Sequence, residues 1–268
     1  MRIQLFVERM RGLKATGLMI AGILSGTMLM PRVAYPQSEG PSAINIGPEV
    51  LKQSPPGENW PSYNGDYSGR RYSGLSQINP ENVSQLSAQW VFHSDNSDRL
   101  EVTPVVINGL MLVTSANDTY ALDARSGREI WHHSVPKNEG LIDDAAGHHT
   151  RGVAIWHSRV YMNTDNAHLL CLDLRSGHLV WDVPYADWNK NYGATSAPLA
   201  VNGKILVGTS GGDDGVRGFV AAYDAESGKL AWRFWTIPAP GEFGSESWPG
   251  DSYLHGGGTT WKIGRAHV

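Results

Sequence analysis

The sequence predicts an all-β fold, because one strand–turn–strand unit recurs along it at a nearly constant interval. The unit reads Asp-x-x-Ser-Gly-x-x-x-Trp, and its three copies end at Trp131, Trp181 and Trp232. These tryptophans are 50 and 51 residues apart. Strand-rich repeats of about 40–50 residues are typical of β-propeller blades. We therefore expect a partial β-propeller built of four-stranded blades that carry a tryptophan repeat.

Each part of the unit has a physical role in a hairpin. An apolar strand ends at an aspartate such as Asp123, whose carboxylate can accept hydrogen bonds from the amides of the turn. Gly127 then takes the positive φ angle that residues with side chains resist. The second strand leads to Trp131, a large ring that suits a wedge between neighbouring blades. The alternative is an unrelated run of β-hairpins, and three matches to the whole unit disfavour it.

Further hairpins precede the repeat in each predicted blade. Asn108-Gly109 separates two apolar runs, and Asn202-Gly203 does the same 94 residues later. Asn-Gly between apolar runs is the strongest short signal for a hairpin. Residues 86–92, which include Trp90, form another expected strand, and no segment after residue 90 shows helical periodicity.

Charge and cysteine content exclude some classes of partner. The net charge is −4, and residues 1–34 hold five of the Lys and Arg residues but only one acidic residue. The rest of the chain is therefore clearly acidic, which disfavours nucleic acid and anionic membrane surfaces as partners. Cys171 is the only cysteine, so it cannot form an internal disulfide, and we interpret it as a small core residue.

The N-terminal part resembles an export signal. Residues 1–14 are basic, residues 15–30 are apolar, and Pro31 ends the apolar run. We expect a signal peptide over residues 1–34, no membrane span after its cleavage, and a periplasmic protein. The alternative is an uncleaved N-terminal anchor. Residues 35–57 are rich in Pro, Ser and Gly and are interpreted as a linker, and residues 58–261 as the propeller.

Several short motifs add a resemblance to a known family. They are Asn59-Trp60-Pro61, Arg70-Arg71-Tyr72-Ser73, Arg151-Gly152-Val153-Ala154, the run from Ser210 to Gly218, and Gly256-Gly257-Gly258-Thr259-Thr260-Trp261. Together with the repeat, they resemble the N-terminal part of the alcohol dehydrogenases that depend on pyrroloquinoline quinone (PQQ). This family consists of quinoproteins with eight-bladed propellers. The resemblance implies a propeller truncated from an eight-bladed ring.

Residues 262–268 resemble translated sequencing-adapter DNA, so we expect them to be an artefact.

The resemblance implies roles for individual residues around the propeller axis. The residues implied to contact PQQ are Glu101, Arg151, Thr195, Ser210, Gly211, Gly212 and Trp261. Asp213 falls where the family has a glutamate that ligates calcium. Each also has a structural alternative: Glu101 as a solvated carboxylate, Arg151 as an ion-pair partner, Asp213 in a surface turn, and Trp261 as an inter-blade wedge.

The sequence departs from the family pattern in three places. The alcohol dehydrogenases carry adjacent cysteines shortly before the arginine, whereas residues 143–150 contain none. Membrane glucose dehydrogenases use a histidine near there, so His148 or His149 is a candidate to cover the quinone; a polar loop is the alternative. Asp213 is one methylene shorter than glutamate, which weakens bidentate reach to calcium. The catalytic aspartate and the remaining calcium ligand would follow Trp261, so no catalytic residue is assigned.

Two functions follow from these patterns. The first is the N-terminal part of a periplasmic dehydrogenase that uses PQQ and calcium to oxidise an alcohol or sugar, with a cytochrome c as electron acceptor; the chain as it stands is expected to be inactive. The second is an exported quinoprotein-like propeller that binds no cofactor and acts as a binding or scaffold module. The missing cysteines and Asp213 favour the second, and Glu101, Arg151 and Trp261 favour the first.

The interpretation of residues 1–34 predicts export with cleavage. Expressed with its own leader in a Gram-negative host, the protein should appear in the periplasm with a new N-terminus near residue 35, because basic and apolar segments in this order are read by the export machinery. N-terminal sequencing of the periplasmic fraction measures this. Recovery of intact Met1 in the membrane fraction would instead establish an uncleaved anchor.

Overall fold

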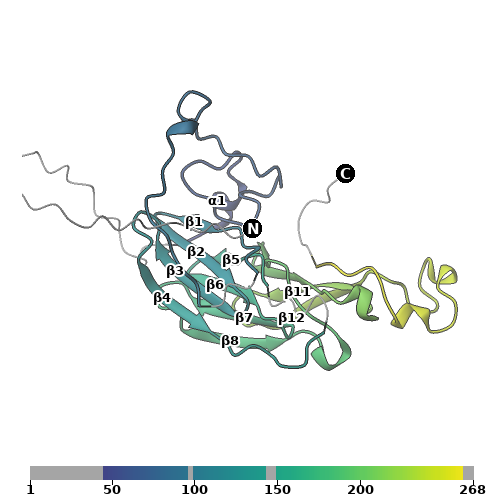
Figure 1. Cartoon of the computed structure of the whole chain (residues 1–268). Coiled ribbons are helices and arrows are strands. Elements are labelled where there is room, and N and C mark those ends of the chain that lie inside the picture. Colours follow the sequence, from purple (N-terminus) through teal and green to yellow (C-terminus); the bar gives the residue numbers. More distant parts are fainter. Residues whose placement is uncertain (1–44, 96–98, 143–148, 262–268) are drawn as a thin grey trace, which may run out of the picture. The chain divides into compact units, whose positions relative to one another are not determined.

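The computed structural model describes residues 45–95, 99–142 and 149–261, and three four-stranded antiparallel sheets form the framework of this part (Figure 1). The first sheet contains β1 (Val105–Ile107), β2 (Leu110–Ser115), β3 (Asp118–Asp123) and β4 (Glu129–Ser134). The second contains β5 (Ala154–Trp156), β6 (Arg159–Asn163), β7 (His168–Asp173) and β8 (Leu179–Pro184). The third contains β9 (Leu199–Val201), β10 (Lys204–Gly208), β11 (Phe219–Asp224) and β12 (Leu230–Trp235).

Helices are short in the described ranges. They are α1 (Pro48–Lys52) and the 3-10 helices η2 (Val83–Gln85), η3 (Trp188–Lys190), η4 (Gly212–Asp214), η5 (Ser245–Ser247) and η6 (Ser252–Leu254). None of the helices described here has the length and apolar character needed to cross a bilayer. The all-β prediction is therefore confirmed.

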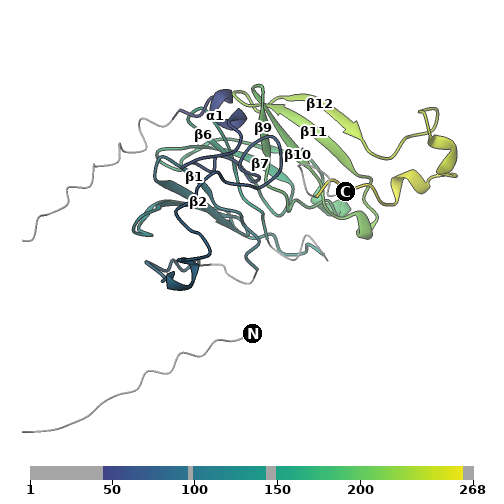
Figure 2. The same cartoon turned by 90° about the horizontal axis from the view of Figure 1, so that it is seen from above.

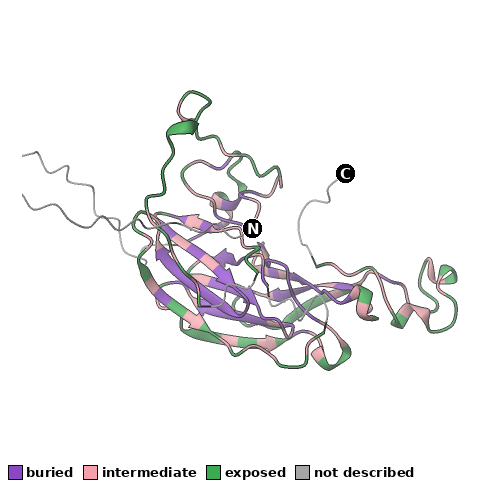
Figure 3. Cartoon of the chain, viewed as in Figure 1, coloured by how far each residue is buried: buried purple, intermediate pink, exposed green. Residues whose placement is uncertain are grey.

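The strands of each sheet are hydrogen-bonded in chain order, as in a propeller blade. The fourth strands are the least buried: β8 and β12 are largely exposed, whereas β5 and most of β3 and β7 are buried (Figure 3). The first three strands of the sheets therefore form the interior, and β5 and β9 are in direct contact. Figure 2 shows the sheets side by side when seen from above.

The repeated unit folds in the same way in all three sheets. The pairing register of the third and fourth strands shifts just before each aspartate, at Ala121/Leu122, Cys171/Leu172 and Ala222/Tyr223. In the third sheet, Asp224 accepts hydrogen bonds from the amide and hydroxyl of Ser227, at 3.1 and 2.8 Å. A hydrogen bond from Lys204 and those from Ser227 lower the pKa of Asp224 to about 2. The carboxylate therefore stays charged and holds the turn.

Two tryptophans of the unit, Trp131 and Trp181, pack on the next hairpin as the wedge interpretation predicts, whereas Trp232 of the third copy is 45% exposed. The indole Nε1 of Trp131 donates to the carbonyl oxygen of Leu174 at 2.9 Å, and the ring lies against Gly177. Trp90 and Trp181 donate in the same way to the carbonyl oxygens of Ala124 and Glu226. The tryptophan repeat is thus the contact that joins one sheet to the next.

Two expectations outside the sheets need comment. The strand expected over residues 86–92 pairs with no strand of the described part, and a β-strand needs a neighbour to accept its hydrogen bonds. Trp90 within it still docks on the hairpin at Ala124. Part of the expected linker packs on the second sheet, where Ile46 pairs with His157 and Leu51 is buried. The side chains of Ile46 and Leu51 are apolar, so burial favours this packing.

Cys171 lies in β7 and is fully buried. Burial raises the pKa of its thiol to about 12, so the sulfur stays protonated and unreactive. Its interpretation as a core residue is confirmed.

The packing of Trp131 on Gly177 predicts a large effect of one methyl group. Gly177 and Gly203 both have a φ angle of +70°, but a Cβ at Gly177 would lie 2.5 Å from the Trp131 ring, whereas a Cβ at Gly203 would meet nothing within 4 Å. Both alanine variants are strained, and Gly177→Ala should cost about 1–3 kcal/mol more unfolding free energy than Gly203→Ala, the usual range for overpacking. Urea unfolding of the two variants measures the difference. Equal losses would show that the tryptophan contact adds nothing to stability.

Candidate functional site

The predicted site residues gather at one end of the sheets, where the first strands begin. Glu101 precedes β1, Arg151 precedes β5 and Thr195 precedes β9, so the three occupy comparable places in three sheets. The second strand of a blade runs antiparallel to the first and ends on the same side, which brings Ser210 after β10 to this end. The topology thus brings together residues that are about 50 positions apart in the chain.

Arg151 is at the centre of the cluster. Its Nη2 lies 2.5 Å from Glu101 Oε2, and its Nη1 donates to the carbonyl oxygen of Thr195 at 3.0 Å. The main chain of Arg151 also donates to Thr195 O at 3.1 Å, and its carbonyl oxygen accepts from the amide of Thr103 at 3.0 Å. Backbone and side chain are therefore both fixed, and the guanidinium is mostly buried with a defined direction.

Trp261 lies against this arginine. The Cζ of Arg151 is 4.8 Å from the centroid of the Trp261 ring, within the range of a cation–π contact. The neighbouring Thr260 holds this segment in place, because its hydroxyl donates to the carbonyl oxygen of Phe219 and accepts from the amide of Thr209 at 3.3 Å. The indole remains 44% exposed, so a flat surface stays available beside a fixed positive charge.

A histidine lies beside Glu101. The Nε2 of His149 is 3.5 Å from the same Glu101 oxygen that contacts Arg151, and the His149 side chain is buried. The sequence suggested His148 or His149 as the histidine that covers the quinone. His148 lies outside the described residues, and the structure brings His149 to the cluster. The Glu101 carboxylate therefore lies between two nitrogen donors.

The loop after β10 approaches the cluster with little side-chain bulk. The amide of Ser210 donates to the carbonyl oxygen of Gly193 at 2.9 Å, which ties the loop to the segment that carries Thr195. Gly211 has a φ angle of +97°, and a Cβ at Gly212 would lie 2.6 Å from the hydroxyl oxygen of Thr259. Small residues are therefore required here by the packing itself.

Asp213 follows in η4 and is exposed. No three His, Cys, Asp or Glu side chains gather closely enough for a metal ion among residues 45–95, 99–142 and 149–261. The described residues thus do not surround Asp213 with further ligands, and its role in binding calcium stays a prediction.

Buried hydroxyls line this end of the sheets, and sequence reasoning missed most of them. Within the described part of the chain, the hydroxyl oxygens of Thr150, Thr209 and Ser210 are buried and have no hydrogen-bond partner. A buried polar group without a partner costs free energy, so such groups in a native protein call for an explanation such as a ligand or bound water. The sequence did contain a signal for such hydroxyls. Ser115, Thr164 and Thr209 follow the turn between the first and second strands at the same spacing in each sheet, and all three are buried.

Taken together, these groups suit a flat, anionic ligand. A fixed guanidinium can pair with a carboxylate, and small residues allow amides and hydroxyls to approach it. The Trp261 ring offers a surface for stacking. Fold and site therefore define a propeller-type protein with an arginine-centred polar cluster where the first strands begin.

The chain belongs to the PQQ-dependent dehydrogenase propellers. The family described as "PQQ: Glucose/ethanol/alcohol dehydrogenase, beta-propeller domain" matches residues 60–266. The resemblance seen in the sequence is thus confirmed, and so is the partial propeller.

Individual relatives agree with this assignment. The chain is 38% identical to the quinohemoprotein alcohol dehydrogenase ADH-IIG of Pseudomonas putida over 82% of its own length and 33% of that protein. It is 34% identical to the lanthanide-dependent methanol dehydrogenase of Methylacidiphilum fumariolicum over 82% of its length and 40% of that protein. The crystal structure of the quinohemoprotein alcohol dehydrogenase from Comamonas testosteroni superposes with a TM-score of 0.68 at 32% identity, over 81% of this chain and 34% of that one. The chain thus spans between a third and two fifths of the length of these relatives.

Proposed function

We propose that this chain supplies the first blades of a dehydrogenase that oxidises an alcohol with PQQ. The observation that carries the proposal is the fixed Arg151 guanidinium, held between Glu101 and Thr195 O beside the exposed face of Trp261. The relatives named above, which are alcohol and methanol dehydrogenases, support an alcohol as substrate. A sugar is the second candidate substrate, because the family description includes glucose.

The described residues fit a flat cofactor with several carboxylates. Arg151 would pair with one carboxylate, and Glu101 would keep the guanidinium directed toward it. The unpartnered hydroxyl of Ser210 and the amides near Gly211 would bind polar edges of the ring system, while Trp261 would support its plane. His149 is buried beside Glu101 and would limit the access of water from that side. When bound, the quinone supplies the redox chemistry by accepting the hydride of the alcohol.

The metal and the activity of the isolated chain belong to the same proposal. Asp213 would supply one carboxylate ligand to calcium, with further ligands from outside the described residues. Its shorter side chain favours contact through one oxygen over bidentate binding. One relative is named as lanthanide-dependent, so a trivalent ion is a second candidate. We infer that the 268 residues alone do not turn over substrate, because the described part gathers no carboxylate and imidazole groups into a metal site.

Location and electron acceptor are inferred from the leader and from the relatives. The basic and apolar segments of residues 1–34 support export to the periplasm. Relatives that are named quinohemoproteins support a cytochrome c as the group that receives electrons from the quinone.

A propeller without cofactor, acting as a binding or scaffold module, is the second candidate function. It is favoured by the single cysteine, because Cys171 is buried in β7 and cannot replace the adjacent pair of the alcohol dehydrogenases. The exposed position of Asp213 favours it as well.

PQQ binding tests the proposal directly. The full-length gene product, stripped with a chelator and titrated with PQQ and calcium, should quench its tryptophan fluorescence at a ratio of one PQQ per chain. Arg151→Ala should weaken this binding by about 1–3 kcal/mol, the range for a hydrogen bond to a charged group. The matched control is Arg159→Ala, which removes an arginine that pairs with Asp173 in the second sheet, away from the cluster.

Two results would decide against the dehydrogenase. If the folded wild type does not bind PQQ, the scaffold function replaces it. If Arg151→Ala and Arg159→Ala weaken binding equally, the Arg151 cluster is not the binding site.

A further inference from the structure

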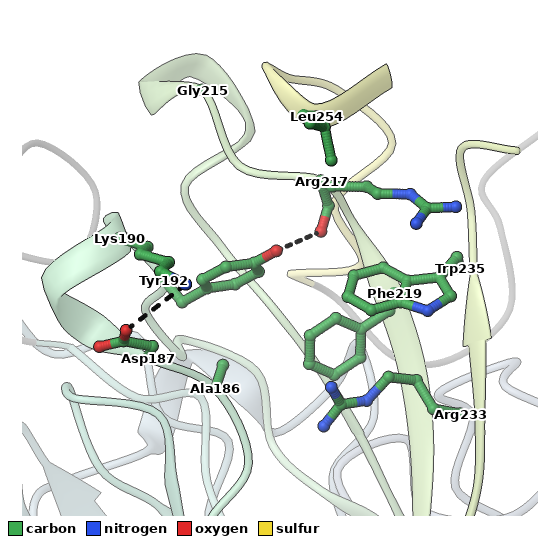
Figure 4. A pocket seen from close by; sticks show the side chains of 10 residues that line it. All are labelled: Ala186, Asp187, Lys190, Tyr192, Gly215, Arg217, Phe219, Arg233, Trp235 and Leu254. Carbon is green, nitrogen blue, oxygen red and sulfur yellow. Dashed lines mark hydrogen bonds and ion pairs between the residues drawn. The ribbon is translucent and has the colours of Figure 1, made fainter. Parts of the chain in front are cut away.

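A largely apolar cavity lies between the third sheet and the segment that follows the second sheet, apart from the Arg151 cluster. Its volume is about 460 Å³, within the range of small-molecule sites. Figure 4 shows the side chains that line it, which include Tyr192, Arg217, Phe219, Arg233 and Trp235. None of the residues predicted to contact PQQ lines it.

Residues of the third sheet and of the segment after the second sheet line this cavity. Side chains of a strand alternate between the two faces of a sheet, so Arg233 and Trp235 in β12 lie on the opposite face from Trp232 and Phe234. Trp232 and Phe234 are 45% and 66% exposed. The Nη2 of Arg233 donates to the carbonyl oxygen of Tyr185 at 2.7 Å. This hydrogen bond places the β12 face that carries Arg233 against the end of the second sheet. The cavity therefore lies between that face and the segment that follows the second sheet.

Arg233 brings a positive charge to the cavity without a carboxylate partner. Among the described residues, no carboxylate oxygen lies within ion-pair distance of it, and its buried Nε–H has no acceptor. Arg217, the other arginine of the cavity, is satisfied: two of its nitrogens donate to the carbonyl oxygen of Ile237, and Glu242 lies at 3.6 Å. An arginine in partly buried surroundings without a counter-charge is costly, so an anion at Arg233 would lower the free energy of the folded state.

Aromatic rings form the rest of the wall. The Cζ of Arg233 is 4.1 Å from the Phe219 centroid, and Phe219 packs edge-on against Trp235 with the ring centroids 5.2 Å apart. The Tyr192 ring is 5.9 Å from Phe219, and its hydroxyl donates to the carbonyl oxygen of Arg217. Burial raises the pKa of Tyr192, so this hydroxyl stays protonated and the ring stays fixed. The wall is thus rigid and apolar beside one unpaired charge.

We propose that this cavity binds a small organic acid, whose carboxylate pairs with Arg233 and whose flat apolar part packs against Tyr192, Phe219 and Trp235. A carboxylate supplies the missing counter-charge, and a ring or short apolar chain fills the space between the aromatic walls. Lys190 at the rim pairs with Asp187, another lining residue, at 4.0 Å, so Arg233 is the group left to bind the carboxylate.

Benzoate and benzyl alcohol test the proposal as a matched pair. They share a ring, but only benzoate carries a charge. Isothermal titration of the full chain should show one benzoate per chain, and benzyl alcohol should bind at least about tenfold more weakly, because it offers the guanidinium no charge-assisted hydrogen bond. Equal affinity for the two compounds would overturn the assignment of Arg233 as the carboxylate partner.

Variants locate the binding. Arg233→Gln should weaken benzoate binding at least about tenfold, while Arg159→Gln, on the second sheet, should leave it unchanged. Arg151→Gln should also leave it unchanged; loss of binding in that variant would place benzoate at the PQQ cluster and overturn the proposal.

A cavity-filling variant covers the case in which Arg233→Gln does not fold. Leu254 lines the rim and is 46% exposed, so Leu254→Trp would fill the opening without touching the arginine. It should block benzoate while the thermal unfolding curve stays that of the wild type. Undiminished binding in folded Leu254→Trp would show that the acid binds elsewhere.

Discussion

The contact between a tryptophan of one sheet and a glycine of the next hairpin is the interaction on which the rest of the structure depends. Trp131 fills the space that a side chain at Gly177 would occupy, and its ring nitrogen bonds the main chain of the same hairpin. The contact therefore fixes both the distance and the rotation between two sheets. Because it recurs at the same place in each unit, the first strands converge at a common end, and their preceding residues meet there. The Arg151 cluster exists only because this geometry is repeated.

The repeat keeps its geometry while its chemistry changes from sheet to sheet. One diagonal contact between strands differs from sheet to sheet. It joins the first residue of the third strand to the residue that follows the tryptophan of the fourth strand. The pairs are Asp118 with His132, His168 with Asp182, and Phe219 with Arg233. The first two are hydrogen-bonded histidine–aspartate pairs of opposite order, and in the third a ring stands where the first pair has its carboxylate. Among the described residues the Arg233 guanidinium then has no carboxylate partner, and an aromatic cavity lies beside it.

The sequence was sufficient for the local parts of the fold, because those depend on neighbours in the chain. Asn108 and Asn202 adopt the positive φ angles that their hairpins require, and each aspartate of the repeat holds its own turn. Residues whose role depends on other sheets were harder to predict. The selection of Glu101 and Arg151 rested on the family resemblance, and His149 and Thr209 gained significance only from their neighbours. No periodicity in the sequence reports that a buried hydroxyl lacks a partner.

The two arginine sites differ in what holds the charge before a ligand arrives. Arg151 is mostly buried and pairs with Glu101, which is 41% exposed, so the guanidinium is neutralised and its direction is fixed before a ligand arrives. A ligand carboxylate there would share the arginine with Glu101 and not replace it, because Thr195 O already fixes one edge of the fork. Within the described residues no carboxylate pairs with Arg233, so an arriving anion gains the whole ion pair. The first arrangement favours a ligand bound through many contacts at once, such as a planar polyacid; the second favours a small acid bound mainly through its charge.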